Sequence, residues 1–405
     1  MTPRRAGTVA LAAVAIALLA LTLRIAVASL SPLIEVIRQD FSLPPATVGL
    51  IGMAPPVAFA VASLVTPAIE RRVGLERLVL IAAIGSAAML ALRATAGSAV
   101  MLLAATGGVF LAVGAANVLI PAVVKKYFPG RIGLMTTVYS TSMAIATFVP
   151  PFVAVPLADA VGWRTTFGLW AAVALTAVVP WVALALRARV SRADRLEEPR
   201  ASVLARVVRV PQTWALVVSF VVTSSVAYTC FAWLPEILRD VAGVNAAEAG
   251  GLLALFSFMG LPMSLLVPAL VARSKQIWPF YAVAVIGGFA AVAGLLFAPA
   301  AAPALWVVLL GFPPMLFPLT LVLFGLRTRS HDTSVALSGI VQCVGYGLTA
   351  ALPLALGVTH EVTGGWTVGI ILIAAVTALA IPSGIMASRN ESIEDAWERR
   401  NGRRW

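Results

Sequence analysis

The chain has 405 residues, of which 60% are hydrophobic and 11% are charged, and its formal net charge is +12 at pH 7. Soluble domains carry about 25% charged residues, so this composition excludes a soluble globular protein. The two cysteines, Cys230 and Cys343, both fall inside apolar runs and indicate neither a disulfide framework nor a zinc site.

Apolar runs long enough to cross a ~30 Å hydrocarbon core repeat along the whole chain. The first run follows the residues MTPRR and is too long for a signal peptide, so we expect it to be retained as a helix. Prolines inside several runs are compatible with a polytopic bundle, because neighbouring helices can satisfy the freed backbone groups. We predict twelve transmembrane helices, over residues 8–37, 46–69, 77–95, 98–124, 132–158, 164–187, 211–237, 247–272, 278–298, 303–326, 333–359 and 365–388.

Arg24 lies near the middle of the first run. A helix that begins at Thr8 reaches Arg24 after about 24 Å, close to the bilayer midplane. An arginine that faces lipid there costs roughly 2.5–3.5 kcal/mol. We therefore predict that Arg24 faces a cavity and binds an anionic or strongly polar substrate, since the guanidinium fork suits planar anions. The alternative is a structural arginine that donates to backbone carbonyls of a kinked neighbouring helix.

The other basic residues are assigned to the segments between the predicted spans and to the two ends of the chain. If the N-terminus lies inside the cell, 24 of the 29 Lys and Arg residues fall in inside segments and four fall outside, at Arg38, Arg93, Arg164 and Arg239. This asymmetry predicts that both termini are cytoplasmic. It also explains the basic net charge by topology and affinity for anionic lipid, so no nucleic-acid partner is expected. Arg24 is then the only basic residue assigned to a span.

A long charged segment, RARVSRADRLEEPRASVLARVVRV, separates six runs from six. The two halves align without a gap at an offset of 203 residues, which pairs Pro32 with Pro235, Gly108 with Gly311, Pro150 with Pro353 and Trp163 with Trp366. Such a repeat indicates a duplicated six-helix unit, a pattern typical of transporters. We predict a six-helix half over 1–188, a cytoplasmic basic linker over 189–210, a second half over 211–388 and a cytoplasmic tail over 389–405.

Two short segments resemble the major facilitator superfamily: GWRTTFGLW, which opens the sixth run, and the loop PAIERRVGLERL. The loop differs from the family pattern at Pro67 and Arg71. Two longer stretches, LTLRIAVASLSPLIEVIRQDF and NVLIPAVVKKYFPGRIGLMTTVYSTSMA, resemble the cyanate-transporter-like and 2-nitroimidazole-exporter family. The resemblance implies an all-α membrane protein with two pseudo-symmetric halves that works by alternating access. The matching residues are Arg24, Asn117, Pro121, Lys125, Phe128, Pro129, Gly133, Met135, Thr136 and Tyr139, whereas Thr22 and Ala26 depart from the family pattern.

The offset also identifies candidate partners for Arg24. Arg24 aligns with Ala227, so the predicted site is asymmetric, and Tyr139 aligns with Gln342. Gln342 and Tyr346 share a helix face, being four residues apart. The predicted substrate-binding residues are Arg24, Asn117, Tyr139, Tyr228, Phe231, Gln342 and Tyr346. Packing between helices is the alternative for the tyrosines, and a hydrogen bond to a neighbouring helix is the alternative for Asn117.

Gating residues are predicted at the two ends of the spans: Arg71 and Arg72 in the basic loop, and Glu35 and Trp233 near the outer ends. No Asp or Glu lies deep in a predicted span, and His331 and His360 fall at loop junctions. The chain therefore lacks the buried acids and metal ligands of a membrane enzyme, and it has no ATP-binding P-loop motif. Facilitated diffusion, anion exchange and coupling to protons all remain open.

We predict a monomeric secondary or facilitative transporter in the cytoplasmic membrane that needs no cofactor and no metal. Its substrate is a small anionic or polar solute, and Arg24 is the central anchor. The alternative function is a multidrug-type exporter of neutral or cationic compounds in which Arg24 is structural.

Overall fold

The computed structural model describes residues 3–128, 131–187, 201–274, 276–402 and 404–405, and all the regular structure in these ranges is helical. The chain divides into two compact units. One unit comprises Met1–Leu196 with Asn245–Ala254, and the other comprises Glu197–Val244 with Leu255–Trp405. Pro129 and most of the predicted linker lie outside the described residues.

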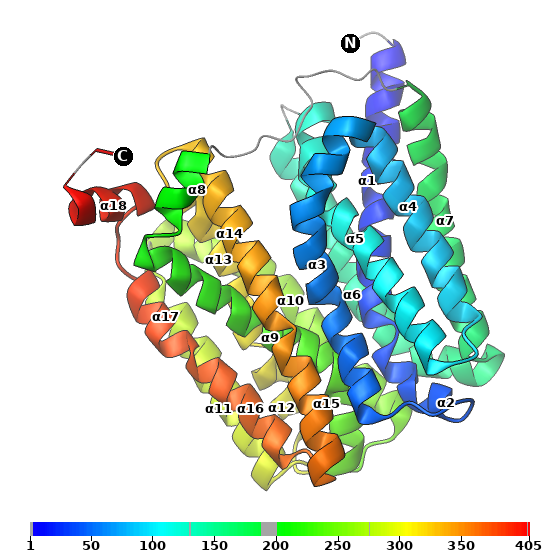
Figure 1. The fold of residues 1–405 in the computed structure, drawn as a ribbon. Coiled ribbons are helices and arrows are strands. Elements are labelled where there is room, and N and C mark those ends of the chain that lie inside the picture. The colour runs from blue at the N-terminus through cyan, green and yellow to red at the C-terminus, as the bar shows by residue number, and fades with distance from the viewer. Residues whose placement is uncertain (1–2, 129–130, 188–200, 275, 403) are drawn as a thin grey trace. The chain divides into compact units, whose positions relative to one another are not determined.

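The N-terminal unit is a helical bundle in which α1 packs against α6 and α7, α4 packs against α5 and α7, and α3 packs against α5 (Figure 1). Its core is made of small and branched apolar side chains such as Ile16, Leu19 and Leu90. The elements of this unit are α1 (Pro3–Ala28), η1 (Ser31–Leu33), α2 (Ile34–Arg38), α3 (Pro45–Val73), α4 (Leu75–Ala94), α5 (Ala99–Tyr127), α6 (Ile132–Val161) and α7 (Trp163–Arg187).

The C-terminal unit is organised around the long helix α9, which packs against α13, α14, α15 and α17. Helix α10 (Ala246–Ser274) begins in the N-terminal unit and continues into this one. The other elements are α8 (Ala201–Val207), α9 (Pro211–Ala242), α11 (Trp278–Phe297), α12 (Pro303–Leu310), η3 (Pro313–Met315), α13 (Leu316–Leu326), α14 (His331–Thr349), α15 (Ala351–Thr363), α16 (Thr367–Ala378), α17 (Ala380–Ala387) and α18 (Ile393–Asn401).

The described residues contain twelve helical spans long and apolar enough to cross a membrane, which confirms the predicted number. Four of these spans are interrupted. The first breaks between α1 and η1, the tenth at η3, the eleventh at Ala350 and the twelfth at Leu379. Proline alone does not decide where a span breaks, because α6 is continuous although it contains Pro150, Pro151 and Pro156.

The internal repeat is visible in equivalent side-chain contacts within each unit. In the N-terminal unit, Trp163 Nε1 donates to Asp40 Oδ2 at 3.0 Å. In the C-terminal unit, Trp366 Nε1 donates to Asp240 Oδ2 at 2.7 Å. Each tryptophan stands at the start of the sixth span of its half, whereas Asp40 directly follows the first span of its half and Asp240 lies in the last turn of the first span of its half. The same bond therefore ties together the same two spans in both halves.

The C-terminal tail is folded onto its own unit. Helix α18 begins at the N-cap Ser392, whose hydroxyl accepts from the Asp395 amide at 3.0 Å. Arg329, which precedes α14, pairs with Asp395 at 3.0 Å and with Glu398 at 2.7 Å. On the other side of α18, Arg206 of α8 lies over the Trp397 ring, 5.0 Å from its centroid.

Candidate functional site

Arg24 lies in the middle of the first span, which extends from Gly7 to Arg38. It belongs to the less buried stripe of α1, at three- or four-residue spacing from Leu21, Ala17 and Val14, whereas Leu23 and Ile25 on either side are buried. The Arg24 side chain is half-buried and forms no hydrogen bond or ion pair with any residue that the structure describes. A permanently charged group in this position is available to a ligand.

Asn117 is likewise a half-buried polar side chain, and it has no hydrogen bond within the described chain. It stands on α5, which packs against α1. A shared landmark relates its depth to that of Arg24, because Arg93 contacts both Ala26 of α1 and Phe110 of α5. Measured along the helix axes toward the end that carries the N-terminus, Arg24 lies about 3 Å beyond Ala26, and Asn117 lies about 10 Å beyond Phe110. The two polar groups are thus staggered along the bundle.

Tyr139 lies on α6, against which α1 also packs, and its side chain is half-buried. Arg24, Asn117 and Tyr139 therefore stand on three helices of one unit, α1, α5 and α6. The structure brings these helices together, but among the described residues none of the three side chains forms a hydrogen bond with another of the three.

In the C-terminal unit, two of the predicted residues are in contact. The rings of Tyr228 on α9 and Tyr346 on α14 pack edge to face, with centroids 6.4 Å apart. Phe220 packs on the other side of Tyr346 at 4.9 Å. Both tyrosines are buried, so they form part of the packed junction between α9 and α14.

Gln342 and Phe231 have partners elsewhere in the same unit. Gln342 Nε2 donates to the Ser338 hydroxyl, one turn earlier on α14, at 2.7 Å. The Phe231 ring packs edge to face on Phe256, with centroids 5.9 Å apart. Both side chains remain half-buried and therefore retain exposed surface for a ligand.

The predicted gating residues lie in different environments. Glu35 pairs with Arg38 at 3.4 Å at the end of the first span, and Arg72 is exposed. The Arg71 side chain lies outside the described part of the chain. Trp233 is fully buried and donates to the Pro353 carbonyl at 2.8 Å, so its geometry favours a packing role over the gating role we predicted.

Arg93 is a second intramembrane arginine, although the sequence pattern places it among the outer segments. It lies in the last turn of α4, inside the third span, and is fully buried. Its Nη1 donates to the Ala26 carbonyl at 3.0 Å, and its guanidinium lies over the rings of Phe110 and Phe167. Arg24 is therefore not the only basic residue within a span. Arg93 caps the broken end of α1, which is the structural role that formed the alternative for Arg24.

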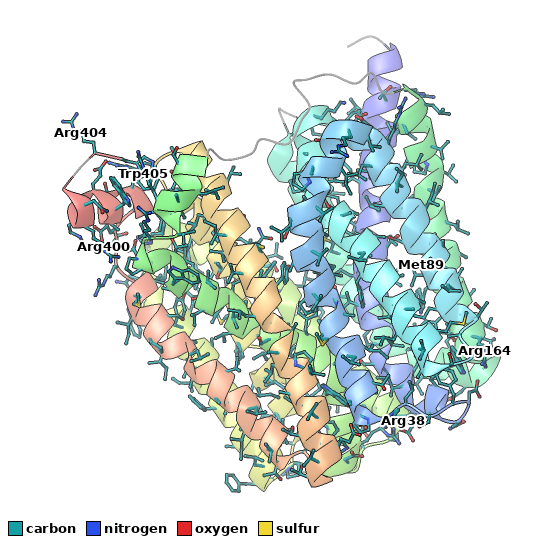
Figure 2. The ribbon with its side chains drawn as sticks, in the orientation of Figure 1. Arg38, Met89, Arg164, Arg400, Arg404 and Trp405 are labelled. Atoms are coloured by element: carbon teal, nitrogen blue, oxygen red, sulfur yellow. The ribbon has the colours of Figure 1, made fainter. Side chains whose placement is uncertain are left out.

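The surroundings of the two tryptophan-bonded aspartates, Asp40 and Asp240, differ in charge between the units. Asp40 forms an ion pair with Arg164, which follows Trp163 directly. Hydrogen bonds from Arg164 and Trp163 hold the pKa of Asp40 below its ordinary value. Figure 2 shows Arg164 and Arg38 at the end of the N-terminal unit opposite the N-terminus. In the C-terminal unit the corresponding group is Asp240, with Glu236 and His360 beside it.

A cavity of about 510 Å³ lies within the N-terminal unit, lined by Phe152, Val153, Pro156, Leu157, Ala160, Ala247 and Gly251. These side chains offer no polar group for recognition of a charged or hydrogen-bonding solute. None of the predicted substrate residues lines this cavity, so it does not coincide with the candidate site.

The family model of the Major Facilitator Superfamily matches residues 15–350. The chain belongs to this superfamily. It is 31% identical to the uncharacterized transporter YycB of Bacillus subtilis (strain 168), over 95% of this chain and 94% of that protein. It is also 31% identical to the 2-nitroimidazole transporter of Escherichia coli (strain K12), over 93% and 95% of the two chains. The crystal structure of the nucleoside transporter NupG superposes with a TM-score of 0.74 at 12% identity and covers 94% of this chain and 98% of that one.

This membership establishes a multi-pass membrane transporter of a small solute, and not an enzyme. It also confirms the all-helical fold with two six-helix halves that the sequence predicted.

Proposed function

We propose that this major facilitator transporter carries a small, planar, oxygen-rich solute, anionic or strongly polar, and that Arg24 is its anchor. The observation that carries the proposal is the half-buried Arg24 guanidinium in the middle of the first span, without a partner in the described residues. A buried charge without a protein partner is costly, so a bound counter-group stabilises it.

The chemistry of arginine narrows the solute class. Its planar fork donates two parallel hydrogen bonds, a geometry that suits the two oxygens of a carboxylate or of a nitro group. A transporter of 2-nitroimidazole is 31% identical to this chain over nearly its whole length, and the nitro group presents such a pair of oxygens. Asn117 and Tyr139, on helices next to α1, supply additional polar contacts in this proposal.

The alternative function, export of neutral or cationic compounds, gives Arg24 a structural role. The role of Arg93 argues against that reading, because Arg93 already holds the carbonyl at the break in α1. In this proposal the site is central in the membrane and both termini lie on the cytoplasmic side.

The test is ligand-induced thermal stabilisation of the purified protein. A bound ligand raises the apparent stability by mass action. The panel contains cyanate, nitrate, short carboxylates, aromatic acids, 2-nitroimidazole and cationic dyes. We expect stabilisation by an anion or a nitro compound, loss of the shift in Arg24→Ala, and a weakened shift in Arg24→Lys, which keeps the charge but loses the fork.

Arg187→Ala is the matched control, because Arg187 is exposed at the end of a span of the same unit and lies outside the proposed site. It should keep the full ligand shift. If only cationic or neutral compounds without an oxygen pair stabilise the protein, and do so equally in wild type and Arg24→Ala, then Arg24 is structural and the exporter function replaces the proposal.

A further inference from the structure

Three side chains at the outer end of the C-terminal unit bring nitrogen and oxygen ligands together. The ligand atoms of Glu236, Asp240 and His360 all lie within 4.8 Å of one another. Glu236 and Asp240 are one turn apart on α9 and share a helix face. His360 comes from α15, which packs against α9.

Trp366 orients two of these three side chains. Its Nε1 donates to Asp240 Oδ2 at 2.7 Å. Its indole stacks on the His360 ring, with centroids 3.9 Å apart and an interplanar angle of 11°. Trp366 is itself held by Trp233, at 5.2 Å between ring centroids. The carboxylate and the imidazole are thus fixed by a rigid aromatic support, as outer-sphere groups fix metal ligands.

The His360 ring has an unused hydrogen-bonding position. Its Nδ1 is buried and has no hydrogen-bond partner among the residues that the structure describes. A buried ring nitrogen without a partner is costly. A metal ion, as a Lewis acid, would satisfy a ring nitrogen and two carboxylates together.

The internal repeat allows the cluster to be compared with the matching positions of the N-terminal unit. The N-terminal unit has the same aspartate–tryptophan bond, but there Arg164 neutralises the aspartate. At the offset of 203 residues, the position of Arg164 is occupied by Thr367, and that of His360 by Leu157. The second half therefore carries a threonine where the first half has Arg164, and a histidine where the first half has a leucine.

We propose that Glu236, Asp240 and His360 form a binding site for a divalent transition-metal ion, with Zn²⁺ as the best match. One imidazole and two carboxylates are ligands that zinc accepts, whereas Ca²⁺ and Mg²⁺ prefer oxygen ligands only. Ligands around tetrahedral zinc lie roughly 3.3 Å apart, so the three side chains need only small rotations to close on the ion. The bound ion links the outer ends of the seventh and eleventh spans. The proposal is independent of the role of Arg24.

The test uses full-length protein purified through a tag that contains no histidine and stripped with EDTA. Zinc binding is measured by calorimetry, and the shift of the unfolding temperature is measured with added ZnCl₂. We expect one Zn²⁺ per chain and a higher unfolding temperature. The affinity should fall at least tenfold in His360→Ala and in Asp240→Asn.

His331→Ala is the matched control, because His331 is the only other histidine in the sequence. It should bind zinc like the wild type. Unfolding temperatures in EDTA show whether each variant is folded, and His360→Gln provides a second variant with less loss of volume. X-ray absorption at the zinc edge should show imidazole and oxygen ligands.

If the wild-type protein binds no zinc at free Zn²⁺ concentrations up to about 100 µM, the proposal is overturned. Wild-type affinity in folded His360→Ala and His360→Gln would overturn it as well. Loss of binding in His331→Ala, or an absorption spectrum without imidazole, would assign the ion to a different place.

Discussion

Arg24 and Arg93 stand in the same helical unit and illustrate two solutions for an arginine within the membrane. Arg93 is fully buried, donates to a backbone carbonyl and lies between two aromatic rings. Arg24 is half-buried and has no partner in the described chain. The first arrangement completes a helix end, and the second leaves the charge without a protein partner in the described residues, as the proposed anchoring of a solute requires. The local sequence around each residue is apolar in both cases, so only the fold distinguishes the two roles.

Gly345 of α14 lies against the Phe220 ring of α9 at the aromatic cluster. A Cβ atom at this position would lie 2.5 Å from the Phe220 ring, and Phe220 is fully buried. We predict that Gly345→Ala destabilises the protein by about 1–3 kcal/mol through overpacking. The measurement is the unfolding temperature in detergent.

The control for this prediction lies two residues away on the same helix. A Cβ atom at Gly347 would have no neighbouring atom within 4 Å, so Gly347→Ala adds only helix propensity, worth about 1 kcal/mol. It should unfold at the wild-type temperature or above. Equal unfolding temperatures for the two variants would contradict the close packing of Phe220 against α14.

At the scale of single elements, α18 shows how charges order a segment that is too polar to enter the membrane. Glu394 Oε1 accepts from the amides of Arg329 and Ser330 at 3.0 and 3.1 Å, next to the start of α14. Arg329 in turn pairs with Asp395 and Glu398. The tail is therefore attached through carboxylates.

These carboxylates make the attachment of α18 sensitive to acid. The Ser392 hydroxyl and the charge of Arg329 lower the pKa of Asp395, and hydrogen bonds from the Trp405 amide and Arg329 lower the pKa of Glu398. A lowered pKa in the folded state stabilises the attachment above the ordinary carboxyl range, near pH 4, and this contribution is lost as the pH falls through the lowered values. We predict that α18 loses protection first on acidification.

Hydrogen exchange, corrected for the intrinsic effect of pH on the exchange rate, measures this loss. The double variant Asp395→Asn, Glu398→Gln should be less protected in α18 at pH 7 and should show little further change toward pH 3. If the double variant loses as much hydrogen-exchange protection in α18 between pH 7 and pH 3 as the wild type does, groups other than Asp395 and Glu398 cause the acid sensitivity.

The sequence predicted which segments form spans but not where the spans break. Length and apolar composition determine whether a helix can cross a membrane, and both can be read from the chain. The break in the twelfth span falls at Leu379, in the turn before Pro382, yet α6 is continuous across three prolines. These breaks depend on neighbouring helices, which a single sequence does not reveal.

The same limit applies to the two candidate sites. Arg24 was predictable because a lone charge in an apolar run has a high cost wherever the run folds. The three-residue cluster at His360 was not predictable, because it needs the packing of α15 on α9. The i, i+4 spacing of Glu236 and Asp240 was visible in the sequence, but it supplied only two of the three groups.

At the scale of the whole molecule, the duplicated halves and the distribution of basic residues predict one orientation in the membrane. The segments expected inside the cell carry 24 Lys and Arg residues and those expected outside carry three, now that Arg93 is found inside a span, so the positive-inside rule predicts that both termini are cytoplasmic. Single cysteines in a background with Cys230→Ala and Cys343→Ala test this orientation. Suitable exposed positions are Gly97 and Ala300 in loops expected outside, and Asn401 at the end of α18.

We predict that a membrane-impermeant maleimide labels Gly97→Cys and Ala300→Cys in intact cells. Asn401→Cys should react only after the membrane is opened, because the tail lies on the side of the basic loops. One outer position is taken from each half, so the experiment also tests whether the two six-helix units share one orientation. Labelling of Asn401→Cys in intact cells would reverse the topology, and labelling of only one of the two outer positions would show that the halves are oppositely inserted.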